Sequence, residues 1–469
     1  MPGLTPAIPL PEGVILCART LERAGGRPFL VGGAVRDYLL GGEVKDYDLE
    51  VFGLSAETTR EALAAIARTE PAGDSFPVFK VGGLPGVSGQ LDVALPRRDS
   101  KRGIGHRGID AVADPSMNIK DAARRRDFTM NAMMLDLKTG VIEDPFGGRR
   151  DLEARVLRAV DDGTFGEDPL RALRAAQFAA RFEMTVDEGT SRLCERMALE
   201  ELPAERIFGE IEKALLRAPR PSIAFKLLAE WNQLRAIAPE LVPLALTQQD
   251  PEWHPEGDVW THTLLVIDVA RTMIDDLDLP RALAVMLGAL CHDLGKPGTT
   301  KFEEGRIRSR GHEEAGVDPT RSLLDRWNVH TRDGYALRDQ VVALVRDHLK
   351  PGALHQARAE VSAGAIRRLA SRVEADLLYR VARADCLGRT GDFQPVAMEW
   401  FIGEVRRLAV ERKAPTPFLL GRDVLALGIA PGPRVGKLLA EIYEQQLDSK
   451  IVSREEALAL AALLAAAAP

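Results

Sequence analysis

The fold is decided by residues 27–52, which read RPFLVGGAVRDYLLGGEVKDYDLEVF. Residues 27–31 form a short apolar run typical of a strand, and Gly32-Gly33 and a stretch through Leu40 that favours a helix follow it. Glycines between a strand and a helix let backbone N–H groups approach an anion, although a Gly-Gly turn by itself is most often only a tight turn. The segment predicts an α/β unit with a candidate phosphate site at Gly32 and Gly33.

Two acidic residues follow this segment that favours a helix. Asp46 and Asp48 lie two residues apart on a β-like run, so we expect both carboxylates on one face. Two ionised carboxylates repel each other, and Mg²⁺ relieves this because it prefers oxygen ligands and serves phosphoryl displacement in two-metal sites. Asp92, an acid inside the apolar strand predicted at 90–95, supplies a third ligand. For Asp46 and Asp48 alone, a surface turn is the alternative.

The segment Glu167-Asp168-Pro169-Leu170-Arg171 contains a second pair of charges. Pro169 suits the first turn of a helix, and Asp168 and Arg171 are three residues apart on one face. Such a pair is commonly a surface ion pair, and the alternative is base recognition. A carboxylate accepts from the exocyclic amine of cytosine or adenine and a guanidinium donates to the ring nitrogen, whereas uracil and guanine present a carbonyl instead. Arg174, one turn further on, is either an accessory to this site or solvated.

Histidines gather in the second half of the chain, where seven of the eight fall within residues 253–355. An adjacent His-Asp pair at the end of an apolar helix is by itself compatible with helix-end polarity. Several such motifs together favour a transition metal bound by imidazole and carboxylate groups. The residues concerned are His254, His262, His292, Asp293, His312, His348 and Asp385.

Composition bounds the class of protein. The 469 residues carry 62 − 69 = −7 net charge, with 45% hydrophobic and 28% charged residues, which favours a soluble globular protein and argues against disorder or a membrane span. The net charge gives no hint of a nucleic-acid partner, although 97–107 and 124–126 are locally basic. Cys17, Cys194, Cys291 and Cys386 are far apart and are expected to be reduced core thiols. No secretory signal is visible, so the default expectation is a cytoplasmic location.

The length predicts about three domains. The first 150 residues are rich in glycine and β-formers, whereas the remainder has helical periodicity broken by prolines and is expected to be all helical. We predict a head at 14–150, a helical neck and body at 151–245, a histidine-bearing domain at 250–390, and a helical tail at 395–469.

Four ordered blocks carry a resemblance to a known family. They are Gly-Gly-x-Val-Arg-Asp with Asp-x-Asp at 32–48, RRDFTMNA at 125–132, DPFGGRRDL at 144–152 and EDPLR at 167–171. Residues 25–220 thereby resemble the class II tRNA nucleotidyltransferase and bacterial poly(A) polymerase family, within the polymerase-β-type nucleotidyltransferases. The resemblance implies an α/β polymerase-β-like head followed by an all-α neck, body, HD domain and tail.

The resemblance also implies roles for residues. Asp46, Asp48 and Asp92 would be catalytic and would hold Mg²⁺, and Asp168 and Arg171, with Arg174, would select CTP and ATP. Its other implied nucleotide-binding residues are Gly32, Gly33, Arg36, Arg125, Arg126, Asp127 and Asn131. The basic loop at 97–108 corresponds to a flexible loop of the family that helps to switch nucleotide choice, and His106 within it receives no role.

The histidine motifs resemble the HD phosphohydrolase superfamily, especially the HD domain of bacterial CCA-adding enzymes. This likeness implies that His262, His292, Asp293 and Asp385 bind a divalent transition metal. His312 and His348 would extend the site to a second metal or contact phosphate. The implied activity is a phosphohydrolase, such as a 2′,3′-cyclic phosphodiesterase, 2′-nucleotidase or phosphatase on RNA ends. Residues 420–436 resemble a tail element of the same family, which meets tRNA.

The leading hypothesis is therefore a CCA-adding tRNA nucleotidyltransferase that uses CTP and ATP, with no membrane partner and an open oligomeric state. Its closest competitor is a poly(A) polymerase or a partial enzyme that adds only CC or only A. A different class is an HD phosphohydrolase with a degenerate RNA-binding head, and a third is a noncatalytic RNA-binding protein.

Overall fold

The computed structural model describes residues 8–44, 46–71, 78–101 and 109–467, without the side chains of 99–101, 109–111 and 467. The chain divides into two compact units, the first comprising residues 1–210 with 230–233 and the second 211–229 with 234–469. In the described part of the chain, no helix combines the length and the apolar character needed to cross a membrane.

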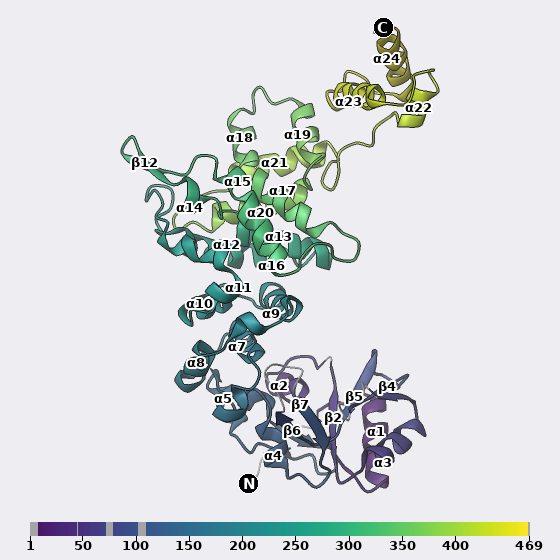
Figure 1. Ribbon diagram of the computed structural model, residues 1–469, viewed down its shortest axis with the longest axis vertical. Coiled ribbons are helices and arrows are strands. Elements are labelled where there is room, and N and C mark those ends of the chain that lie inside the picture. The colour runs from purple at the N-terminus through teal and green to yellow at the C-terminus, as the bar shows by residue number, and fades with distance from the viewer. Residues whose placement is uncertain (1–7, 45, 72–77, 102–108, 468–469) are drawn as a thin grey trace. The chain divides into compact units, whose positions relative to one another are not determined.

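The first unit is built on a seven-stranded sheet (Figure 1) with the strand order β3-β4-β5-β2-β1-β8-β9. Only β2 and β5 run parallel; every other neighbouring pair in this sheet is antiparallel. The strands are β1 (Arg27–Val31), β2 (Asp48–Phe52), β3 (Arg68–Pro71), β4 (Val78–Gly82), β5 (Gln90–Ala94), β8 (Met134–Asp136) and β9 (Ile142–Glu143). A separate hairpin pairs β6 (Arg97–Lys101) with β7 (Ile109–Ala113).

Alternation along β1 places its side chains in two layers. Phe29 and Val31 join a buried cluster with Phe52 of β2 and with Ala122 and Ala123 of the helix α4 (Ile119–Arg124). The rings of Phe29 and Phe52 meet edge to face at 5.3 Å. Helix α1 (Glu12–Arg23) packs against β1 and against α3 (Ala56–Ala64). The sheet is thus covered by helices and anchors the loops that follow β1 and precede β2.

Helices continue the first unit after the sheet. They are α2 (Gly33–Leu39), α5 (Gly148–Glu153), α6 (Asp162–Phe165), α7 (Leu170–Phe182), α8 (Glu188–Glu195) and α9 (Ala204–Arg217), with 3-10 turns η2 (Thr129–Asn131) and η3 (Leu199–Glu201). Helix α9 runs from the first unit into the second.

The second unit is almost wholly helical, and α12, α13, α17 and α20 pack together in it. Its helices are α10 (Ser222–Glu230), α11 (Leu234–Ile237), η4 (Pro239–Leu246), α12 (Val259–Arg271), α13 (Leu279–Cys291), α14 (Lys296–Thr299), α15 (His312–Ala315), α16 (Val317–Arg326), α17 (Leu337–Asp347), α18 (Lys350–Gln356), α19 (Ala363–Ala370), α20 (Ala375–Leu387), α21 (Val396–Arg407), α22 (Gly421–Leu425), α23 (Pro433–Leu447) and α24 (Arg454–Ala467). Buried residues of α23 and α24, Ile442, Ala457 and Ala461 among them, form a core of their own.

The fold class expected from the sequence is confirmed, with two corrections. The region after residue 151 is not purely helical, because β10 (Val156–Leu157) pairs with β11 (Thr185–Val186) and β12 (Lys301–Glu303) pairs with β13 (Arg306–Arg308). Asp46 lies outside β2, which begins at Asp48, so the prediction that strand alternation places both carboxylates on one face is wrong for Asp46. The division at 150, 245 and 390 stays a prediction.

The four cysteines are free and buried, as the sequence predicts. Burial raises the pKa of the Cys17 thiol to about 11 and that of Cys194 to about 12. These thiols are therefore protonated and unreactive at neutral pH.

Candidate active sites

The acids of the head meet where β2 and β5 lie side by side. Asp48 and Asp92 are direct register partners on these two parallel strands, so the strand that supplies the third acid is the neighbour that the sequence analysis expected. Asp46 is exposed and lies just before β2. Burial and then the charge of Asp92 raise the pKa of Asp48, with a smaller rise from Asp46 and an opposing effect from Arg126. A cation at this place would relieve the crowding of negative charge.

The glycine turn sits beside these acids. Gly32 has φ = 70°, a left-handed conformation that favours glycine, and it leads directly into α2. A Cβ atom at Gly32 would lie 3.4 Å from Nη1 of Arg126 and 3.9 Å from a carboxylate oxygen of Asp48. The turn therefore brings backbone close to both the Asp48 carboxylate and the Arg126 guanidinium group.

Four residues predicted to bind nucleotide form one network of side-chain hydrogen bonds. Nη1 of Arg36 donates to Oδ1 of Asn131 at 2.7 Å, and Nδ2 of Asn131 donates to Oδ1 of Asp127 at 3.0 Å. Nε of Arg174 then donates to Oδ2 of Asp127 at 2.8 Å. Burial alone would raise the pKa of Asp127, but the Arg174 charge and the hydrogen bonds lower it. This network links α2 to α7. Arg174 is therefore not simply solvated.

Arg125 and Arg126 share a buried partner that the sequence analysis did not single out. Glu50 of β2 is fully buried, and its two carboxylate oxygens accept from Nη2 of Arg125 at 2.9 Å and from Nη2 of Arg126 at 2.8 Å. Burial opposes ionisation, but the two guanidinium groups lower the pKa of Glu50 below its ordinary value. A signal was present, since Asp48 and Glu50 share a face of the strand and Glu50 interrupts an apolar run.

Asp168 and Arg171 flank the start of α7 and bond to different partners. Oδ1 of Asp168 accepts from the backbone N–H of Leu170 at 3.1 Å, and Oδ2 accepts from Nη2 of Arg206, on α9, at 3.1 Å. Arg171 donates to the carbonyl oxygen of Thr164 at 2.6 Å. It also donates to the carbonyl oxygen of Arg125, the C-cap residue of α4, at 2.8 Å. Each member of the pair is held by other groups, and no sequence pattern pointed to Arg206.

A basic cavity of about 320 Å³ lies near this helix start. Arg97, Arg98, Arg124 and Arg125 line it together with acidic and neutral residues that include Glu167. The structure therefore brings together residues of the two segments that the sequence shows to be locally basic. Residues 102–108, including His106, lie outside the described residues.

In the second unit, two histidines stand at helix ends in the same way. His292 is the C-cap of α13 and His348 is the C-cap of α17. Nδ1 of His292 donates to the carbonyl oxygen of Ala289 at 2.8 Å, and Nδ1 of His348 donates to that of Val345 at 2.6 Å. A carbonyl oxygen only accepts, so Nδ1 carries a proton and Nε2 is the nitrogen that faces the cluster.

His312 and His262 follow the same pattern with other partners. Nδ1 of His312 donates to the carbonyl oxygen of Ser309 at 2.7 Å, and Nδ1 of His262 lies 2.8 Å from Oε1 of Glu256. Glu256 also contacts Nδ1 of His254 at 2.9 Å. Carboxylates and carbonyls that hold the outer nitrogen of a histidine are typical of metal sites. Glu256 was missed by the sequence analysis, because nothing in its spacing distinguishes it.

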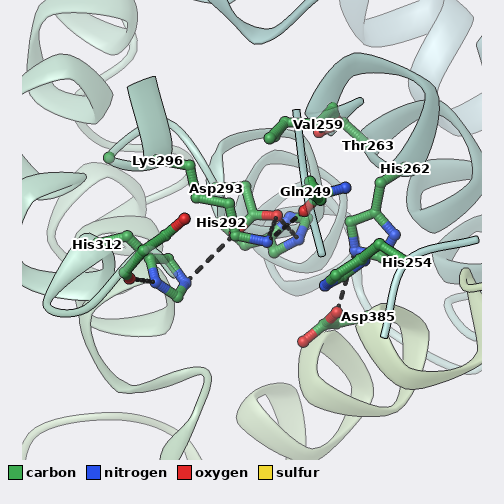
Figure 2. A network of polar contacts seen from close by, with 12 residues as sticks. Gln249, His254, Val259, His262, Thr263, His292, Asp293, Lys296, His312 and Asp385 are labelled. Atoms are coloured by element: carbon green, nitrogen blue, oxygen red, sulfur yellow. Dashed lines mark hydrogen bonds and ion pairs between the residues drawn. The ribbon is translucent and has the colours of Figure 1, made fainter. Parts of the chain in front are cut away.

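Asp293 is the acidic centre of this cluster (Figure 2). Its Oδ2 lies 3.1 Å from Nε2 of His292 and 2.7 Å from Nζ of Lys296, and its Oδ1 lies 3.3 Å from Nε2 of His312. Burial alone would raise the pKa of Asp293, but His292 and Lys296 hold it well below its usual range. Lys296 is itself buried and donates to Oε1 of Gln249 at 2.6 Å.

Asp385 of α20 completes the cluster. Its Oδ1 lies 3.1 Å from Nε2 of His262 and 3.4 Å from a guanidinium nitrogen of Arg389. Burial would raise the pKa of Asp385, but Arg389 and His262 keep it well below its usual value. The four predicted metal ligands, His262, His292, Asp293 and Asp385, therefore converge from three helices and the turn after α13.

His312 and His348 face each other through Nε2 atoms that are 3.3 Å apart. With both Nδ1 protons donated to carbonyls, two lone pairs point at one another unless a proton or a cation lies between them. Together with Asp293 they form a group whose potential ligand atoms all lie within 4.8 Å, as do His262, His292 and Asp293. The donor set thus fits metal binding at two adjoining places.

Gly295 explains how His312 reaches the cluster. A Cβ atom at this position would lie 2.0 Å from the carbonyl oxygen of His312 and 2.5 Å from the backbone nitrogen of Gly316. Any side chain at residue 295 would therefore push α15 away from the turn that follows α13. The sequence His292-Asp293-Leu294-Gly295-Lys296 needs its glycine for this close approach.

Comparisons with known proteins agree with this fold and its domains. Residues 28–158 match the poly A polymerase head domain, residues 183–244 match the probable RNA and SrmB-binding site of polymerase A, and residues 259–389 match the HD domain. The fold and its two sites define a nucleotidyltransferase that carries an HD domain.

Curated relatives give the family. The chain is 36% identical over 430 residues to the multifunctional CCA protein of Halorhodospira halophila, covering 88% of this chain and 94% of the relative. It is 38% identical over 377 residues to the multifunctional CCA protein of Aromatoleum aromaticum, covering 78% and 86%. The chain belongs to the family of multifunctional CCA proteins.

Solved structures share the fold. The Bacillus stearothermophilus CCA-adding enzyme in complex with CTP superposes with a TM-score of 0.65 at 21% identity, covering 97% of this chain and 98% of that one. The Thermotoga maritima CCA-adding enzyme complexed with tRNA gives a TM-score of 0.58 at 21% identity, with 97% and 94% covered.

Proposed function

We propose that this chain is a CCA-adding tRNA nucleotidyltransferase, which transfers CMP and AMP from CTP and ATP to the 3′ end of tRNA. The observation that carries the proposal is the register of Asp48 and Asp92 on adjacent parallel strands beside the Gly32 turn. The name of the curated relatives supports CCA addition. The complex of the Thermotoga maritima CCA-adding enzyme with tRNA supports tRNA as the acceptor.

The head would bind the nucleotide as follows. Backbone at Gly32 lies near Arg126 and Asp48. Together with Gly33, Arg36 and Arg125, these groups would bind and neutralise the triphosphate. Asp46, Asp48 and Asp92 would hold Mg²⁺, which supplies charge stabilisation to the attacking and leaving oxygens when bound. The terminal hydroxyl oxygen of the tRNA forms a bond to the α-phosphorus and loses its proton. The bond from this phosphorus to the bridging oxygen breaks, and pyrophosphate leaves.

Base selection follows from the groups at the start of α7. Asp168 accepts from Leu170 and Arg206 and still has acceptor capacity for the exocyclic amine of cytosine or adenine. Arg171 is oriented by two backbone carbonyls and would donate to the ring nitrogen. Uracil and guanine would set a carbonyl oxygen against the carboxylate, so both are rejected.

Incorporation assays test this proposal. A tRNA that lacks its terminal CCA is incubated with CTP, ATP or both, and the product lengths are read on a gel. We expect two additions with CTP alone and three with both nucleotides. Repeated incorporation of ATP alone onto unrelated RNA would instead identify a poly(A) polymerase, and full activity of Asp46→Ala would remove Asp46 from the site.

The second unit supports a second activity, a metal-dependent phosphohydrolase. The supporting observation is that four histidines have Nδ1 held by a carbonyl or carboxylate. Nε2 of three of them lies against the buried Asp293 or Asp385, and Nε2 of His348 faces that of His312. A divalent transition metal on His262, His292, Asp293 and Asp385 would supply an activated water. The oxygen of that water forms a bond to phosphorus while a phosphorus–oxygen ester bond breaks. His312 and His348 would extend the site to a second ion or to the phosphate.

Hydrolysis assays with added Mn²⁺, Co²⁺ or Ni²⁺, in which the nucleotide product is separated from the substrate, test this second activity. Adenosine 2′,3′-cyclic monophosphate should give the monophosphate, and His292→Ala should abolish the reaction without changing nucleotide addition. Unaltered hydrolysis by His292→Ala would contradict the ligand assignment.

The proposed activities assign a role to each predicted part of the chain. The head at 14–150 would carry nucleotide transfer, the neck and body at 151–245 base selection, 250–390 hydrolysis, and the tail at 395–469 RNA contacts. A cytoplasmic location is consistent with this proposal.

A further inference from the structure

The cavity of the HD site has a polar floor and an apolar rim. Its volume is about 260 Å³. Asp293, Lys296, His312, His348, Asp385 and Arg389 line its floor and wall. Trp253, Ile307 and Leu349 also line it, and Trp253 is 49% exposed and Leu349 39% exposed. The proposed metal chemistry uses only the polar groups and leaves the three apolar residues without a role.

The rim is held in place by contacts between two segments. Glu252 forms an ion pair with Arg306 of β13, next to Ile307. Asp250 closes the turn that carries Trp253, since its carbonyl oxygen accepts from the backbone N–H of Trp253 at 3.1 Å and its Oδ1 accepts from Glu252 N–H at 3.1 Å. The indole ring is therefore presented by a fixed turn tied to a hairpin.

We propose that Trp253, with Ile307 and Leu349, forms the subsite that holds the base of a nucleotide substrate of the HD site. This inference rests on the proposed phosphohydrolase activity. The base would stack on the indole of Trp253 while the phosphate group of the same nucleotide reaches the metal ligands.

The chemistry of the cavity supports this occupant. Single exposed aromatic residues are ordinary, but this one stands on the rim of the cavity that holds the metal-ligand candidates, beside two further apolar side chains. Lys296 and Arg389 supply positive charge for a phosphate. An exposed aromatic face can stack with any of the nucleobases, because each base is a flat ring. A ligand that is anionic at one end and flat and apolar at the other satisfies both parts.

The size of the cavity limits which nucleotide-containing ligands can bind in it. The cavity of about 260 Å³ lies just below the range of about 300 to 1,000 Å³ that is common for small-ligand sites, so it suits a single nucleotide and is too small for a duplex. A free nucleotide and the terminal nucleotide of an RNA strand share the recognised chemistry. Separate arms of the experiment distinguish them.

A pair of secondary phosphate monoesters tests the subsite. Adenosine 2′-monophosphate carries a base and glycerol 2-phosphate does not. We expect Trp253→Ala to lower kcat/KM for the nucleotide about 5- to 100-fold, the range that loss of one stacking contact gives. Hydrolysis of glycerol 2-phosphate should stay unchanged, and Trp253→Phe should restore most of the nucleotide activity. Equal losses on both esters, or no loss on either, would overturn the proposal.

Phe302→Ala is the matched control. Phe302 is 76% exposed on the same hairpin and is not among the residues that line the cavity. It should leave both esters unaffected. To identify the source, adenosine 2′,3′-cyclic monophosphate is compared with an oligoribonucleotide that ends in a cyclic phosphate. If Trp253→Ala slows hydrolysis of the free nucleotide, of the RNA or of both, the affected substrates are the ones whose base binds the subsite. If it slows neither, the proposal of a subsite is overturned.

A binding measurement separates the subsite from hydrolysis. Adenosine 2′-monophosphate is titrated into chelator-treated protein, and tryptophan fluorescence is followed. Stacking should quench a component of the emission that Trp253→Phe lacks and that Phe302→Ala retains. If the wild-type protein hydrolyses no ester, the proposed phosphohydrolase fails while quenching still supports the subsite. If hydrolysis occurs without any quenching that depends on Trp253, the subsite fails and the phosphohydrolase stands.

Discussion

The two sites of this molecule position their candidate metal ligands in opposite ways. In the head, Asp48 and Asp92 are placed by the register of two short parallel strands, and Asp46 is exposed just before one of them. In the HD site, buried histidines at helix ends are oriented one by one by hydrogen bonds from Nδ1. On the proposed function, the first arrangement would let substrate phosphates complete the coordination of Mg²⁺, whereas the second would offer preoriented imidazole groups to a metal.

The largest expected effect separates the two sites outright. Asp48→Asn keeps the shape of the side chain and removes its charge, so nucleotide addition should fall at least about 100-fold because a metal ligand is lost. Hydrolysis of adenosine 2′,3′-cyclic monophosphate by the same protein should stay at the wild-type rate. Both reactions are measured on one preparation, and a parallel fall in both would mean that the two sites are not independent.

A buried charge tests how the head holds its arginines. Glu50→Gln should lower the free energy of unfolding of the first unit by about 3 kcal/mol, because Arg125 and Arg126 lose a buried counter-charge. The folded-state pKa of Glu50 lies below its ordinary value of 4.5. The contribution is therefore complete above that value and is lost as the pH falls through the folded-state pKa.

Urea unfolding of wild type and Glu50→Gln at a series of pH values provides the measurement. The gap between the two proteins should be constant near neutral pH and should shrink as the solution is made more acidic than pH 4.5. A gap that widens in acid would contradict the ion pair as its source.

Glu256 tests whether the HD site depends on preorganisation. Glu256→Gln removes the carboxylate that contacts Nδ1 of both His254 and His262. Metal affinity should fall about 10- to 100-fold, as for other partners of metal-bound histidines. Titration of the chelator-treated protein with Mn²⁺ measures the affinity, and excess metal should restore much of the hydrolysis. Unchanged affinity would mean that Glu256 does not orient the ligand.

The smallest effect concerns base selection. Arg206→Gln removes the guanidinium that bonds to Asp168, so the carboxylate gains freedom to turn. We expect the preference for CTP over UTP to fall about 5-fold, the effect of about 1 kcal/mol from one hydrogen bond. Arg206→Lys should recover part of the preference. Equal losses for CTP and UTP would show that Arg206 serves folding alone.

Much of the fold was predictable because local patterns agree with it. The strands at 27–31 and 48–52 and the helix after Gly33 lie where apolar runs and glycines indicated, and the histidine motifs fall at helix ends. Asp92 was recognisable as an acid within an apolar strand. Glu50 carries the same signal and was overlooked, whereas Arg206 and Glu256 carry none, because their partners lie on other segments or follow no periodic spacing.

The sequence by itself determined the residue types that the chemistry requires and the elements that carry them. Period-two alternation in strands and glycine conformations are local properties, so they can be recognised without a structure. Only the tertiary structure decided that Asp48 lies beside Asp92, that Arg125 and Arg126 close on Glu50, and that Trp253 stands over the HD cavity. These are contacts between segments far apart in the chain, and they depend on strand pairing and helix packing, which no single segment specifies.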